Sequence, residues 1–143
     1  MANALRRTYF SLLIPAILGF IVVSLFKALD LISIERVTFM ELLAPLLLAL
    51  SVIFALGLPV FFRALFAHSV REQKSVPEAA LLRFERTFLS IALVTPYLAL
   101  TGYLLDFPRF HLTGSVLMAL YAVYYYFPSQ RRIRFEKRIF RVP

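Results

Sequence analysis

Four long runs without a charged residue constrain this chain more than any other feature. The runs cover residues 8–26, 42–62, 87–105 and 112–130. A helix that crosses the roughly 30 Å hydrocarbon core of a bilayer needs about 20 residues, because each residue rises about 1.5 Å. Every run is close to that length. The sequence therefore predicts an all-α integral membrane protein, built as a four-transmembrane-helix bundle with short loops.

The composition excludes an ordinary water-soluble domain. Hydrophobic residues make up 61% of the 143 residues and charged residues only 17%, whereas soluble domains are about 45–50% apolar and about 25% charged. A chain this short cannot bury so much apolar surface inside itself. We expect one transmembrane domain over residues 1–130, followed by a basic cytoplasmic tail over residues 131–143.

The distribution of basic residues predicts the orientation. Thirteen of the 16 Lys and Arg residues lie before residue 8, between residues 63 and 86, or after residue 130. These segments fall on one side of a four-span topology, and the side rich in Lys and Arg stays in the cytoplasm. We therefore expect both termini to be cytoplasmic, in a plasma or inner membrane.

The second and third runs are expected to continue beyond the bilayer as a cytoplasmic helical hairpin. Ser75 and Glu78 have the spacing of a capping box, in which each side chain bonds a free backbone amide at a helix start. The pattern places the start of the third helix near residue 76, and the second helix is expected to reach about residue 73. A turn centred near Ser75 would pair two sets of rings, Phe66 with Phe84 and Phe62 with Phe88.

Small residues and prolines within the runs predict how the helices pack. Three pairs have the small-xxx-small spacing that permits close helix contact: Ser51 and Ala55, Thr95 and Ala99, Ser115 and Ala119. Prolines inside the runs each remove a helical hydrogen bond. They indicate either packing kinks or a functional hinge, for which residues 57–59 are the best candidate.

Most catalytic and cofactor chemistry lacks the residues it needs. The chain has no cysteine, and its two histidines, His68 and His111, fall on opposite sides of the predicted membrane. Disulfides, thiolate metal sites and a haem held by two histidines of one chain are therefore excluded. The runs contain no charged residue of the kind that marks proton or ion paths. We expect no catalytic residue, no metal and no cofactor, and a protein that is not an enzyme.

The tail is the candidate binding segment. A helix there would place Phe135, Ile139 and Val142 on one face beside basic residues, although residues 132–135 also alternate as a short strand would. Basic segments next to a membrane attract anionic lipid headgroups, or they dock onto an acidic partner. Nucleic acid is not expected, because no nucleic-acid motif accompanies the charge. The candidate residues are Arg131, Arg132, Arg134, Lys137, Arg138 and Arg141.

These observations favour a non-catalytic accessory, assembly or structural subunit of a membrane protein complex. Its expected partners are anionic lipids at the cytoplasmic face and either a larger membrane protein or further copies of the chain. The alternative is a small oligomeric transporter or lipid flippase for an apolar or amphipathic substrate, because kinked helices rich in Tyr and Phe can line a path.

Overall fold

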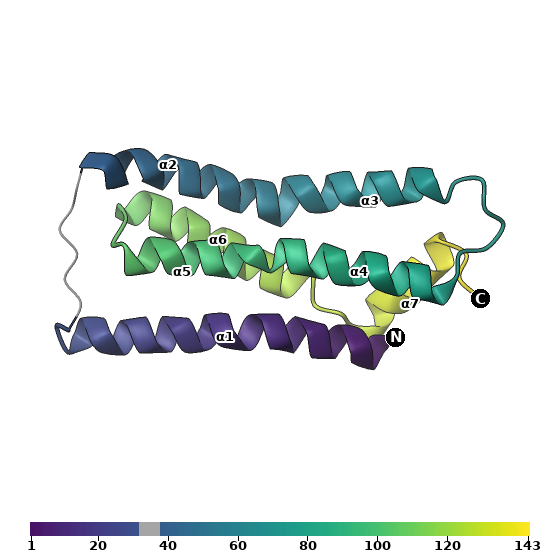
Figure 1. Ribbon diagram of the computed structural model, residues 1–143, viewed down its shortest axis with the longest axis horizontal. Helices are drawn as coiled ribbons and strands as arrows, with labels where there is room; N and C mark the ends of the chain where they lie inside the picture. The colour runs from purple at the N-terminus through teal and green to yellow at the C-terminus, as the bar shows by residue number, and fades with distance from the viewer. Residues whose placement is uncertain (32–37) are drawn as a thin grey trace.

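The computed structural model describes residues 1–31 and 38–143, and within these ranges the chain forms helices and no strand (Figure 1). The labels follow the chain, beginning with α1 at the N-terminus. The elements are α1 (Ala2–Ala28), α2 (Thr38–Val52), the π-helical turn η1 (Ile53–Gly57), α3 (Leu58–Ser69), α4 (Glu78–Ala92), α5 (Val94–Leu104), α6 (Arg109–Tyr125) and α7 (Gln130–Ile139).

Three of the helical rods are long and apolar enough to cross a membrane. They are α1, the continuous rod Glu41–Ser69 made of α2, η1 and α3, and the rod Glu78–Leu104 made of α4 and α5. The all-α class predicted from the sequence is thus confirmed for the described residues, with three helices that could cross a membrane. A bundle of four membrane-spanning helices is not confirmed, because α6, which corresponds to the fourth predicted span, has only 17 residues.

The fourth helix ends earlier than the span predicted from the charge-free run. The charge-free run continues to residue 130, whereas α6 ends at Tyr125. Pro128 explains the difference, since proline has no amide hydrogen to donate and disfavours helical geometry in the residue before it.

The long rods lie side by side (Figure 1). The α1 helix runs along one side and α2 and α3 run along the other, with α4, α5 and α6 between them. Both chain termini lie at the end where α7 is found. We refer to this end as the α7 end and to the other, which carries the turn between α5 and α6, as the opposite end.

The small residues singled out by their spacing are buried where the helices pack. Ser51, Ala55, Thr95, Ala99, Ser115 and Ala119 are all buried. Where α2 meets α6, a Cβ atom added to Gly114 would lie 2.7 Å from Leu48 Cδ1. Glycine at this position therefore permits the leucine to approach the backbone of α6.

The proline at the junction of η1 and α3 produces a fixed irregularity in the rod. Pro59 has no N–H, so it cannot bond the carbonyl of Ala55 four residues earlier. The backbone makes a π turn over η1, and the buried Tyr126 hydroxyl donates to the Ala55 oxygen at 2.6 Å. Because a side chain from α6's end supplies the missing donor, the structure favours a packing kink over a hinge.

The hairpin between α3 and α4 differs in detail from the prediction. The α3 helix ends at Ser69 and α4 begins at Glu78, so both arms are shorter than expected. The α4 N-cap is Pro77, with no side-chain cap bond, so the predicted capping box does not form.

Half of the predicted ring pairing in this hairpin is confirmed. The Phe66 and Phe84 rings stack with centroids 4.2 Å apart and planes 9° apart. The second predicted pair is wrong, because Phe88 packs edge-on against Tyr126 with centroids 5.0 Å apart. Tyr126, at the end of α6, thus packs against Phe88 in the position that the sequence predicts for Phe62.

Candidate functional site

The candidate binding segment is a helix, α7, and local chemistry explains where it begins and ends. Ser129 has an extended backbone, and its hydroxyl accepts a hydrogen bond from the Arg132 amide at 3.2 Å. This is the usual N-cap arrangement. Lys137 and Arg138 lie in the last turn, where positive charge is favoured by the helix dipole. The helical interpretation of the tail is therefore correct, and the alternative strand does not form.

The α7 helix packs with one face against the end of the other helices and leaves the other face exposed (Figure 1). Ile133 and Glu136 are buried, and so is Phe140 just after the helix. Phe135 and Ile139, which lie on the predicted apolar face, are both exposed, so this part of the face does not pack on the other helices. Residues on the exposed side are Arg131, Arg134, Phe135, Arg138 and Ile139.

Two ion pairs with buried carboxylates join α7 to the bundle. Arg132 Nη2 lies 3.2 Å from Glu85 Oε2 of α4, and Arg63 Nη1 of α3 lies 3.0 Å from Glu136 Oε1. Glu85 is 4% exposed and Glu136 is 3% exposed. An unpaired carboxylate at such sites would be costly, so each arginine is needed where it lies.

Arg132 also caps the C-terminal end of α6. Its Nη1 donates to the Tyr126 carbonyl at 2.7 Å. The Tyr9 hydroxyl of α1 donates to the Val123 carbonyl, also at 2.7 Å. The last carbonyls of a helix have no partner within the helix, and here side chains from α1 and α7 supply donors. The same arginine therefore links α4, α6 and α7.

The C-terminal part of α7 is attached to the α3–α4 hairpin. Lys137 Nζ lies 3.1 Å from Glu78 Oε1. The Phe140 ring packs against Phe66 and Phe84, with centroid distances of 5.0 Å and 6.2 Å. Arg141 Nη1 donates a hydrogen bond to the Gln73 carbonyl at 3.5 Å.

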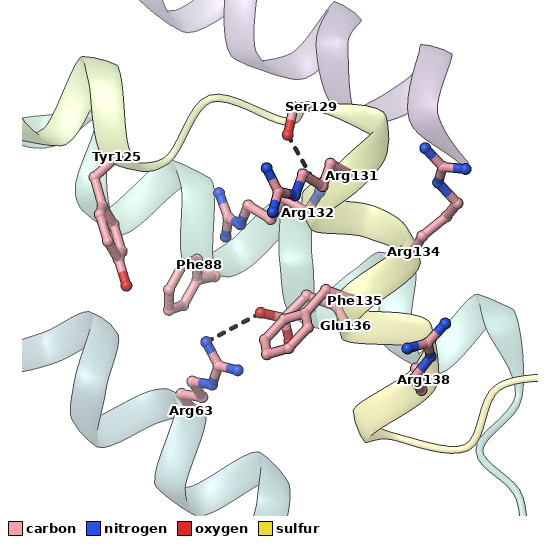
Figure 2. Close-up of a pocket in the computed structure, with 10 residues that line it drawn as sticks. All are labelled: Arg63, Phe88, Tyr125, Ser129, Arg131, Arg132, Arg134, Phe135, Glu136 and Arg138. Atoms are coloured by element: carbon pink, nitrogen blue, oxygen red, sulfur yellow. Dashed lines mark hydrogen bonds and ion pairs between the residues drawn. The ribbon is translucent and has the colours of Figure 1, made fainter.

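A pocket of about 560 Å³ lies between α3, α4, the end of α6 and α7 (Figure 2). We call it the arginine pocket. Figure 2 shows Arg63 reaching across from α3 to Glu136, with Phe88 and Tyr125 forming a wall beside them. The lining residues are Arg63, Phe88, Tyr125, Ser129, Arg131, Arg132, Arg134, Phe135, Glu136 and Arg138.

The six residues singled out in the sequence have different surroundings. Arg131, Arg132, Arg134 and Arg138 line the arginine pocket, whereas Lys137 and Arg141 face the hairpin. Among the residues that the structure describes, Arg131, Arg134 and Arg138 make no ion pair. These three guanidinium groups are therefore available to an anion.

Sequence reasoning missed the residues that hold the site together: Arg63, Glu85, Glu136 and Tyr126. One signal was present, because Glu136 is the lone acidic residue in the strongly basic segment after residue 130. It also has helical spacing from Ile133 and Phe140, the two residues that are buried with it. A single acid on an apolar face indicates a buried partner of opposite charge.

The two histidines lie at different ends of the molecule. His68 belongs to the last turns of α3, and His111 to the first turn of α6, at the opposite end (Figure 1). Across residues 1–31 and 38–143, no three His, Cys, Asp or Glu side chains come together as metal ligands would.

No family model, curated protein or solved structure matches this chain.

Proposed function

We propose that this chain is a non-catalytic accessory or assembly subunit of a membrane complex, and that its α7 end is a preformed surface for an anionic partner. The observation that carries the proposal is the attachment of α7. Two ion pairs with buried carboxylates hold its inner face, while Arg131, Arg134 and Arg138 stay exposed on the outside. A rigid surface loses less entropy on binding than a mobile tail does.

The proposal includes a fourth span, formed by α6. Its 17 residues rise about 26 Å at 1.5 Å each, close to the roughly 30 Å of a hydrocarbon core. Leu117, Leu120 and Tyr124 are exposed along it, as suits side chains that face lipid. With four spans, both termini lie on one side, and the excess of basic residues there favours the cytoplasm of a plasma or inner membrane.

This topology is tested by labelling single cysteines in a chain that has none of its own. In sealed cells, an impermeant thiol reagent should label Arg109→Cys, at the opposite end, and should leave Lys74→Cys unlabelled until the membrane is opened. Labelling of Lys74→Cys from outside would contradict the proposed orientation.

The subunit role is tested by purification from native membranes in a mild detergent. We expect a larger membrane protein to co-migrate in a fixed ratio with the wild-type chain. The triple variant Arg131→Gln, Arg134→Gln, Arg138→Gln should lose that partner while remaining inserted. The matched control Arg7→Gln, Arg83→Gln, Arg86→Gln removes three exposed charges outside the arginine pocket and should keep it. Equal recovery with both variants would count against the proposal.

A second candidate, a small oligomeric transporter or lipid flippase, is favoured by one feature. A cavity of about 310 Å³ lies between α1, α5 and α6, and apolar residues alone line it. A space of this kind within a membrane can take an acyl chain. Purification of the chain as a pure homodimer would favour this candidate. The lining residues are Leu13, Ala16, Ile17, Phe20, Pro96, Val116, Ala119, Leu120 and Val123.

A further inference from the structure

We propose that the arginine pocket binds a phosphate ester that carries a hydrogen-bond donor next to its phosphate. The headgroup of a phospholipid in the inner leaflet has this chemistry, and so do soluble phosphate esters. The inference deepens the proposed function, because the assignment to the inner leaflet rests on the orientation given there.

The charge of the arginine pocket points to an anion. Five guanidinium groups and one carboxylate line it. Glu136 neutralises Arg63, and Glu85 neutralises Arg132 from outside the pocket. The remaining positive charge belongs to Arg131, Arg134 and Arg138. Guanidinium groups donate paired hydrogen bonds to phosphate oxygens, so a phosphate group matches both the charge and the donors.

The helix that carries these three arginines is anchored, although Arg131, Arg134 and Arg138 make no ion pair with the described part of the chain. Arg132 is held by Glu85 and by the Tyr126 carbonyl, which anchors the first turn of α7. Ser129 lines the pocket at the N-terminus of this ten-residue helix, and helix N-termini attract anions. The site is therefore a built cavity on ordered helices, with guanidinium groups arriving from both α3 and α7.

One buried atom adds a second requirement to the ligand. Glu136 Oε2 is buried and has no hydrogen-bond partner within residues 1–31 and 38–143, although its other oxygen pairs with Arg63. A carboxylate oxygen would repel a bare phosphate. A hydroxyl or ammonium group beside the phosphate would donate to it instead. The preferred ligand therefore carries such a donor, as glycerol, ethanolamine and serine headgroups do and choline does not.

The walls of the arginine pocket suit the body of such a molecule. Phe88, Tyr125 and Phe135 contribute rings to its lining. Its volume of about 560 Å³ falls within the range of about 300–1,000 Å³ that small-molecule sites occupy. Tyr125 is exposed and ends the helix that we propose as the fourth span. A headgroup in this pocket would thus lie beside an aromatic side chain of the kind found at membrane boundaries.

The experiment measures ligand binding to the purified, delipidated full-length chain in a nonionic detergent. Native mass spectrometry gives apparent affinities for dioctanoyl phosphatidylglycerol and dioctanoyl phosphatidylcholine. We expect phosphatidylglycerol to bind at least about tenfold tighter, because its headgroup hydroxyl can donate a hydrogen bond to a charged carboxylate and choline cannot. Equal affinity for the two lipids would overturn the inference.

A matched pair of variants tests whether binding occurs in the arginine pocket. Arg131→Gln with Arg138→Gln should weaken phosphatidylglycerol at least about tenfold, whereas Arg7→Gln with Arg86→Gln, which loses the same charge, should not. The pocket variant should fold, because neither side chain makes an ion pair with the described part of the chain. Equal weakening in both variants would contradict the site.

Competition with glycerol 3-phosphate separates the two sources of the ligand. If it displaces phosphatidylglycerol at a similar concentration, the ligand is a soluble phosphate ester. If it does not, the ligand is a lipid headgroup. Both results support a phosphate-ester site. Because the isolated chain is used, failure here leaves the co-migration test of the subunit role unaffected.

Discussion

The two ends of the bundle hold their charged residues in different ways. At the α7 end, Arg132 and Arg63 reach carboxylates that are almost fully buried. At the opposite end, Lys27 lies 3.6 Å from Asp106, whose side chain is 59% exposed. Buried pairs are costly to break because a lone charge remains inside the protein. Exposed pairs contribute little because water screens them.

The apolar packing differs between the ends in the same direction. A large cluster of buried side chains from α1, η1, α4, α6 and α7 lies toward the α7 end, with Tyr126 and Ile133 among them. The cluster near the opposite end has only Ala44, Leu47 and Phe107 as its buried members. From this comparison we expect the α7 end to resist local unfolding more than the opposite end does.

Breaking the Arg132–Glu85 pair should have the largest effect. Arg132→Met leaves Glu85 buried without its partner, and we expect a loss of about 3–5 kcal/mol in the free energy of unfolding. Titration of the detergent-solubilised protein with denaturant measures this loss. The double variant Arg132→Met, Glu85→Leu should recover most of it, since neither charge of this pair then remains. If Arg132→Met were as stable as the wild type, the buried pair at the α7 end would contribute no more to stability than the exposed pair at the opposite end.

Removing one hydroxyl at the α7 end should have an intermediate effect. Tyr126→Phe leaves the Ala55 carbonyl without the donor that replaces the missing amide of Pro59. An unsatisfied buried carbonyl costs about 1–3 kcal/mol. Tyr124→Phe is the matched control, because Tyr124 is 87% exposed, and it should leave the unfolding midpoint unchanged. Equal shifts in the two variants would show that the hydroxyl has no special role.

Removing a charge at the opposite end should have the smallest effect. Asp106→Asn eliminates the pair with Lys27, and asparagine tolerates the left-handed backbone of this residue, where φ is 55°. We expect a change of less than about 1 kcal/mol in the free energy of unfolding. A loss as large as that of Arg132→Met would mean that exposure does not distinguish the two pairs.

Much of this architecture could be predicted from the sequence because it follows from local patterns. The charge-free runs predict the long apolar helices, and the small-residue spacing predicts buried positions such as Ser115 and Ala119. The candidate site could be predicted from the sequence only in part. The basic residues of α7 were identified, but their separate partners depend on contacts between residues far apart in sequence, such as Arg63 with Glu136. Tyr126, at the end of α6, contacts Phe88 in the position expected for Phe62. This contact cannot be predicted from the spacing of residues within the hairpin.

Amide hydrogen exchange of α7 tests the central claim most directly. If α7 is a docked part of the bundle, amides of residues 133–139 should exchange far more slowly than an unfolded chain and should approach the protection of α4. The Arg132→Met variant should lose that protection in α7 first. Exchange of the wild-type segment at the rate of an unfolded chain would contradict the account, because α7 would then be a mobile basic tail.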